Sequence, residues 1–118
     1  MNAADRTFCW LLIIGSVLHA FGAVNAYHGE PETLVWALSA TLAGLLLAAL
    51  NLLRIGRPGD RALAWISFAG CLGWLAEGIG LGMAVGNRLN FGLFTMGMIA
   101  IVLAVFSLRS ATGTHSAN

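Results

Sequence analysis

Glu77 is the residue in this sequence most able to do chemistry, because it interrupts a long apolar stretch. No other acidic or basic residue lies between positions 62 and 85, and Trp74 precedes Glu77 by one helical turn. An ionised carboxylate is costly in hydrocarbon, so such a group must be protonated, paired or exposed to water. We therefore interpret Glu77 as a candidate ligand for a proton or a small cation.

His19 is the expected partner of Glu77, because it interrupts a second apolar stretch at a similar depth. At 1.5 Å of rise per residue, His19 lies roughly 18 Å and Glu77 roughly 22 Å from the same membrane surface. Small residues surround both side chains, which is typical of membrane helices that approach closely. They are Gly15, Gly22 and Ala26 near His19, and Gly70, Gly73, Gly80 and Ala84 near Glu77. We expect the first and third helices to contact each other, with Glu77 facing His19.

Three roles are open for this pair: a structural hydrogen bond between helices, a proton or cation site, and a contact with another subunit. Trp74 adds a further alternative. An indole face beside a carboxylate can hold an organic cation by cation–π attraction. The competing interpretation of Trp74 is a large packing residue.

Two further ridges of small residues recur at every fourth position, and this spacing usually marks contacts between membrane helices. The third helix carries Gly78, Gly82 and Gly86, and the second carries Ala40, Gly44 and Ala48. We interpret both as packing surfaces, within one chain or between protomers.

The remaining residues do not define a metal or cofactor site. Met96 and Met98 could be soft-metal ligands, but residues two apart do not share a helix face. The two cysteines, Cys9 and Cys71, are expected to be free thiols. Motifs of nucleotide-binding proteins, hydrolases, kinases and zinc proteases are missing. We predict no cofactor, no metal, no catalytic residue and no nucleic-acid partner.

Four apolar stretches must position these residues. The chain has 118 residues, of which 58% are hydrophobic and only 9% charged, whereas soluble domains carry about 25% charged residues. Each stretch has the roughly 20 residues that a membrane-spanning helix needs, and the alternation of a membrane β-barrel is missing. We predict an all-α bundle of four transmembrane helices forming a single domain, residues 1–118, in a lipid bilayer. The expected spans are 7–27, 33–53, 62–85 and 89–108, with a flexible tail at 110–118.

The loops carry turn and orientation signals. Asp60 is expected to cap the third helix. Residues 1–26 also resemble a weak signal peptide, but we interpret them as a retained helix.

Five arginines lie on one side of the expected bundle, namely Arg6, Arg54, Arg57, Arg61 and Arg109, and Arg88 alone lies on the other. The positive-inside rule then predicts that both termini are cytoplasmic, in a bacterial-type inner membrane. Arg54, Arg57 and Arg61 could also hold anionic lipid head groups.

In length, number of spans and possession of a membrane-embedded glutamate, the chain is similar to the small multidrug resistance transporters. That family has its essential glutamate in the first helix, whereas Glu77 lies in the third, so we do not assign the chain to it. The first functional hypothesis is an oligomeric transporter or channel that handles protons or a small cation at Glu77 and His19. The alternative is a non-catalytic accessory or assembly subunit of a larger membrane complex.

Overall fold

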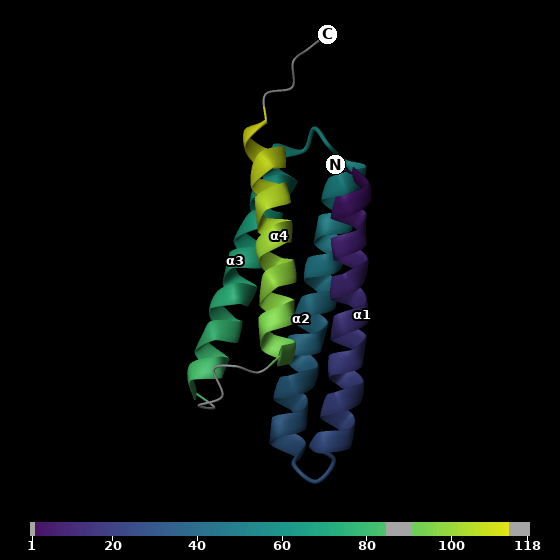
Figure 1. Ribbon diagram of the computed structural model, residues 1–118, viewed down its shortest axis with the longest axis vertical. Coiled ribbons are helices and arrows are strands. Elements are labelled where there is room, and N and C mark those ends of the chain that lie inside the picture. The colour runs from purple at the N-terminus through teal and green to yellow at the C-terminus, as the bar shows by residue number, and fades with distance from the viewer. Residues whose placement is uncertain (1, 85–90, 114–118) are drawn as a thin grey trace.

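The computed structural model describes residues 2–84 and 91–113, and the regular secondary structure within them is all α-helix (Figure 1). The helices are α1 (Asn2–Ala26), α2 (Pro31–Gly56), α3 (Arg61–Ala84) and α4 (Phe91–Thr112). All four are long and apolar enough to cross a membrane. The predicted fold class, an all-α bundle of four transmembrane helices, is therefore confirmed. The helix α4 continues through Thr112, so the first residues of the expected tail are helical instead.

Local signals set the helix ends. Pro31 is in the first turn of α2, where its missing N–H costs nothing because helix N-termini leave such donors unpaired. The Oδ1 atom of Asp60 accepts a hydrogen bond of 2.9 Å from the backbone N–H of Leu63, which caps α3 as predicted. At the end of α2, the backbone N–H of Arg57 donates to the carbonyl of Arg54 and closes the last turn.

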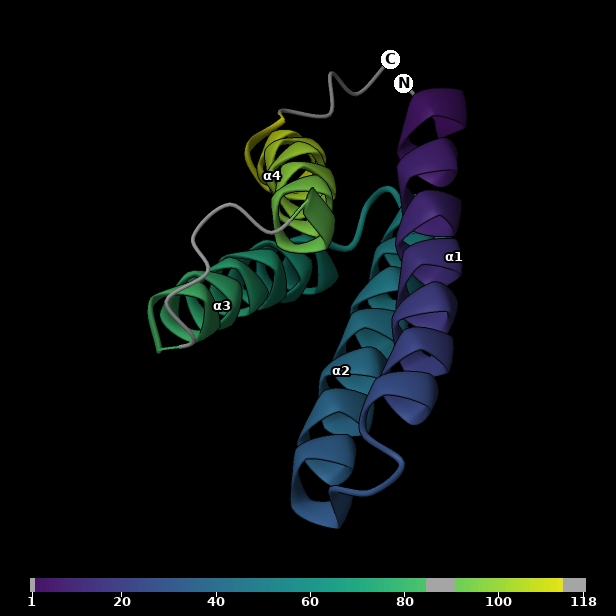
Figure 2. The ribbon, with the colours of Figure 1, turned by 60° about the horizontal axis from the view of Figure 1, so that its bottom comes forward.

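The four helices form two antiparallel hairpins, α1–α2 and α3–α4. The beginning of α1 and the end of α4 lie at one end of the bundle, which we call the terminal end, and residues 27–30 lie at the other, which we call the loop end (Figure 1). The hairpins meet near the terminal end and diverge towards the loop end (Figure 2). The molecule is elongated, with principal extents of 59 × 22 × 21 Å.

The predicted contact between the first and third helices is wrong. In the described residues α1 packs against α2 and α4, and α3 packs against α4 and α2, but no Cα atom of α1 lies within 8 Å of one in α3. The reason is the short α1–α2 connection, which makes consecutive helices antiparallel neighbours. The two helices that run in the same direction are left on a diagonal of the bundle.

The core is small and lies where the hairpins meet. Leu12, Ala48, Cys71 and Leu103, one from each helix, are fully buried there. Elsewhere large apolar side chains point outwards, as Phe21, at 74% exposure, illustrates. Such a surface is suited to hydrocarbon, so the exposed apolar side chains are consistent with contact with a lipid bilayer.

Candidate functional site

Glu77 and His19 both lie on exposed helix faces, on different hairpins. A Cβ atom added at Gly73 or Gly80, the glycines beside Glu77, would meet no atom within 4 Å. The same holds at Gly22, which lies beside His19. The two side chains therefore do not form a site inside one copy of the chain, and each is surrounded by open, small-residue surface.

The two residues nevertheless lie at a common depth, as the sequence predicts. A Cβ atom on Gly44, near the middle of α2, would collide with the Oγ atom of Ser16 and would lie 3.3 Å from Cζ2 of Trp74. Ser16 and Trp74 therefore meet α2 at the same level. His19 and Glu77 follow them by three residues each on helices that run in the same direction, which moves both about 4.5 Å towards the loop end.

Trp74 takes the packing role that was left open for it. Its side chain is half-buried, and it packs against the core as well as reaching Gly44 on the opposite hairpin. Trp74 thereby joins α3 to the opposite hairpin, and Glu77 follows it by one helical turn.

Some of the small residues pack against other parts of the chain, and others do not. Gly15 accommodates the side chain of Met96, Gly70 lies against Leu47, and both Gly78 and Gly82 lie against Leu93. On α2, Ala48 is fully buried, Gly44 is buried and Ala40 is half-buried. These positions thus have neighbours within the chain, whereas a Cβ atom at Gly22, Gly73 or Gly80 would meet no atom of the described chain within 4 Å. Gly86 lies outside the described residues.

A second polar cluster, which the sequence did not reveal, lies near the terminal end. The Nη2 atom of Arg54 donates to Oδ1 of Asp5 across 2.7 Å, and the two side chains are 2% and 4% exposed. The same guanidinium donates through Nη1 to the hydroxyl of Ser110, at 2.9 Å, and through Nε and Nη2 to Oδ1 of Asn51. Three helices, α1, α2 and α4, are joined through one arginine.

Asn51 extends this cluster to α3, the one helix that Arg54 does not reach. Its Oδ1 atom also accepts a 3.0 Å hydrogen bond from the hydroxyl of Ser107, and its Nδ2 atom donates to the carbonyl of Leu47. The same nitrogen lies 3.7 Å from the sulfur of Cys71 on α3. We call Asp5, Asn51, Arg54, Ser107 and Ser110 the polar clamp. Because its charges are paired and bonded, it suits holding the hairpins together rather than binding a ligand.

The position of Arg54 differs from the expectation that it holds a lipid head group. Its guanidinium faces the bundle interior because Asp5 and Asn51 supply acceptors there. Arg61 is exposed, but its Nε atom donates to the carbonyl of Ala111 at the end of α4. Arg57 alone of the three arginines remains exposed without a hydrogen bond from its guanidinium to any described residue.

The clamp escaped prediction because its members lie at the edges of the expected spans. Asp5 precedes the span 7–27 and carries no prediction, and Arg54 follows the span 33–53, which favours a role at the membrane surface for it. One signal was available: Asn51 and Arg54 are three residues apart, and so are Ser107 and Ser110. Residues three apart share a helix face, so these pairs define two polar faces that end at the same membrane surface.

Cysteine and metal chemistry have little support in the described chain. Cys9 and Cys71 are both buried and free. Their helices approach no closer than 8 Å between Cα atoms, whereas a disulfide needs less than about 7 Å. In residues 2–84 and 91–113, no group of three or more histidine, cysteine or acidic side chains could hold a metal ion.

Comparisons with known proteins do not assign the chain to a family. The chain matches no protein-family model, no curated protein and no solved structure. Function must therefore be argued from two features, a satisfied polar clamp at the terminal end and an uncovered carboxylate about two-thirds of the way along α3.

Proposed function

We propose that this protein is the subunit of a homo-oligomeric membrane transporter or channel in which Glu77, with His19, handles protons or a small cation. The observation that carries the proposal is the exposed carboxylate of Glu77 on a spanning helix, beside open space at Gly73 and Gly80. A carboxylate left in contact with lipid tails is strongly disfavoured. A second copy of the chain would cover it.

A neighbouring copy also supplies a suitable partner. His19 is exposed at the depth of Glu77, and both helices present small residues that allow close approach. The α1 face of one copy against the α3 face of the next would bring imidazole and carboxylate together. A histidine near a carboxylate can exchange protons in the physiological range, which suits proton or cation movement.

A single copy offers no comparable polar route. Among the described residues, the buried charged side chains are Asp5 and Arg54, and these neutralise each other near the terminal end. The two hairpins diverge towards the loop end, and none of the described residues places a buried charged side chain between them beside Glu77. A route past Glu77 therefore requires more than one protomer.

We infer the orientation from the arginine distribution. Five of the six arginines belong to the side that carries both termini, which the positive-inside rule assigns to the cytoplasm. The proposed location is a bacterial-type inner membrane, with Glu77 roughly 22 Å from its cytoplasmic surface at helical rise.

The test is flux into proteoliposomes that contain the purified protein. Glu77→Gln keeps the shape of the side chain and removes its charge, so proton or cation flux should fall at least ten-fold. Glu32→Gln is the matched control, because Glu32 is exposed in the first turn of α2, outside the proposed route. Flux that survives Glu77→Gln unchanged would contradict the proposal.

The alternative function is an accessory or assembly subunit, and one observation favours it. Uncovered glycines lie on both hairpins, at Gly22 on α1 and at Gly73 and Gly80 on α3. These faces could dock onto helices of larger membrane partners rather than onto a second copy. A stable homo-oligomer after purification favours the transporter, and constant co-purification with a larger complex favours the accessory role.

A further inference from the structure

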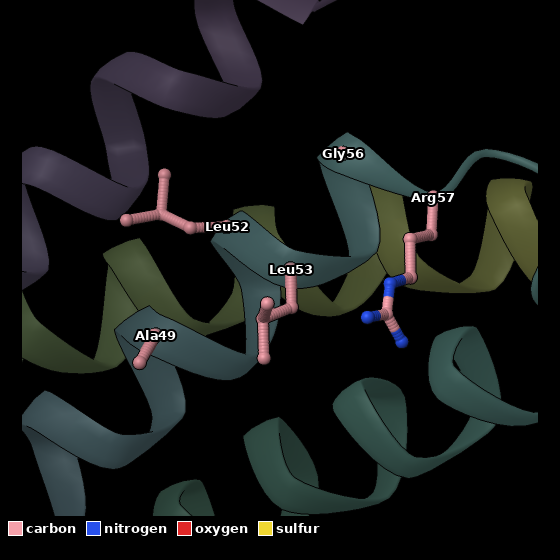
Figure 3. A pocket seen from close by; sticks show the side chains of 5 residues that line it. All are labelled: Ala49, Leu52, Leu53, Gly56 and Arg57. Atoms are coloured by element: carbon pink, nitrogen blue, oxygen red, sulfur yellow. The ribbon is translucent and has the colours of Figure 1, made fainter.

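A shallow hollow lies on α2 close to the terminal end, apart from both the polar clamp and Glu77. Its volume is about 480 Å³, and it is lined by Ala49, Leu52, Leu53, Gly56 and Arg57. Figure 3 shows these residues following one another along α2, with the guanidinium of Arg57 at the end of the row. The lining is therefore apolar along its length and cationic at one end.

Two small residues create the hollow. Ala49 and Gly56 are seven positions apart, which places them two turns apart on the same helix face, and both are exposed. A Cβ atom added at Gly56 would meet no atom within 4 Å. The hollow therefore opens outwards, towards the surroundings of the bundle rather than its core.

Of the three arginines around the connection between α2 and α3, Arg57 is the one whose guanidinium is not bonded to any described residue. Arg54, three residues earlier, is buried in its ion pair with Asp5, and Arg61 is bonded to the carbonyl of Ala111. The guanidinium of Arg57 is exposed and has no hydrogen-bond partner among the described residues. A guanidinium can bind a phosphate through two parallel hydrogen bonds.

The hollow has its positive charge at the membrane surface and its apolar wall deeper, which is also the order of head group and acyl chain in one leaflet of a bilayer. Arg57 directly follows the spanning helix, and Ala49 lies eight residues deeper, roughly 12 Å along the axis. A phospholipid presents its phosphate at the surface and its acyl chain towards the membrane centre. We propose that this hollow is a binding site for one anionic phospholipid, with its phosphate on Arg57 and an acyl chain along Leu53 and Ala49.

A free phosphate ion would use only the guanidinium, and a helix of another protein would use only the apolar wall. The combination of both along the membrane normal favours the lipid. The proposal does not depend on Glu77, so it stands or falls separately from the transport function.

The test is lipid binding to the purified full chain in detergent, measured by native mass spectrometry with phosphatidylglycerol and with phosphatidylcholine. Arg57→Gln should weaken phosphatidylglycerol binding roughly five-fold, the factor that one basic residue contributes at an anionic surface. The same substitution should weaken phosphatidylcholine binding less, because the choline of that head group offsets the charge of its phosphate. Arg109→Gln is the matched control, because Arg109 is an exposed arginine in the last turn of α4, and it should change neither.

A second variant tests the apolar part of the site. Gly56→Leu places a side chain in the hollow, with a Cβ atom that meets no atom within 4 Å, and keeps Arg57, so both lipids should bind at least five-fold more weakly. Gly29→Leu, in the exposed connection at the loop end, adds the same side chain where nothing lies within 4 Å and should have no effect. Equal losses from Arg57→Gln and Arg109→Gln would overturn the proposal, as would unchanged binding in Gly56→Leu. Displacement of phosphatidylglycerol by millimolar inorganic phosphate would identify a free-anion site instead and would also overturn it.

Discussion

Arg54 and Asp5 form an ion pair of 2.7 Å between α2 and α1, and both side chains are almost completely removed from solvent. The pair unites the two helices of one hairpin, and the same guanidinium reaches Ser110 on the other hairpin. Desolvated charges are stable only when paired and bonded. The polar clamp therefore predicts where this bundle is most sensitive to substitution.

Asp5→Ala should strongly destabilise the fold. The substitution leaves the Arg54 guanidinium buried without its countercharge, and removing one partner of a buried pair costs about 3–5 kcal/mol. Chemical or thermal unfolding in detergent micelles measures this cost. The double variant Asp5→Leu/Arg54→Met, which removes both charges, should recover most of the loss. Equal instability of the single and double variants would show that the ion pair is not the cause.

Substitution by alanine should change the free energy of unfolding differently at two fully buried serines. Ser107 donates a 3.0 Å hydrogen bond to Asn51, whereas the Oγ atom of Ser67 has no partner in the described chain. Losing a buried hydrogen bond costs about 1 kcal/mol, and an unpaired buried hydroxyl is itself unfavourable. Ser107→Ala should therefore lower the free energy of unfolding, and Ser67→Ala should leave it unchanged or raise it. Unfolding curves of the two variants, measured side by side, decide the matter.

Gly15→Ala should destabilise the contact between α1 and α4. The added Cβ would occupy the position of the Met96 methyl group. Because this is the far end of a flexible side chain that can shift, the cost should be at the low end of the about 1–3 kcal/mol typical of overpacking. Met96→Ala frees the space, so Gly15→Ala should cost less in a Met96→Ala background than in the original chain. The matched control is Gly22→Ala on the same helix, because nothing lies within 4 Å of that glycine. If both single variants lose the same stability, the Met96 contact does not limit packing.

Gly80→Leu should separate folding from assembly. The added side chain meets open space within one chain, so the helical content and unfolding transition of the monomer should stay as they are. If a second copy covers the surface around Glu77, the same side chain should shift the purified protein towards smaller species in light scattering. An unchanged oligomer would show that this face of α3 lies outside the interface. Gly78→Leu serves as the contrast, since it would collide with Leu93 inside the chain.

The fold could be predicted well from the sequence because its signals are local. Four apolar stretches of membrane-crossing length, Pro31 at the start of α2 and Asp60 before α3 each act within a few residues. The shared depth of His19 and Glu77 was equally available, since it follows from helical rise and alternating direction. The helix bounds and the depths of these residues depend on neighbouring residues in the sequence and on the thickness of the bilayer.

Only the tertiary structure decided which faces meet. The glycines beside His19 and Glu77 indicated close packing, but the short connection between α1 and α2 makes sequential helices neighbours and leaves α1 and α3 on a diagonal. Arg54 looked like a surface charge until Asp5, 49 residues earlier in the chain, was found beside it. A sequence specifies which residues are polar and how deep they lie. The partner of a buried charge depends on how separate helices pack, and that long-range arrangement leaves no trace in local spacing.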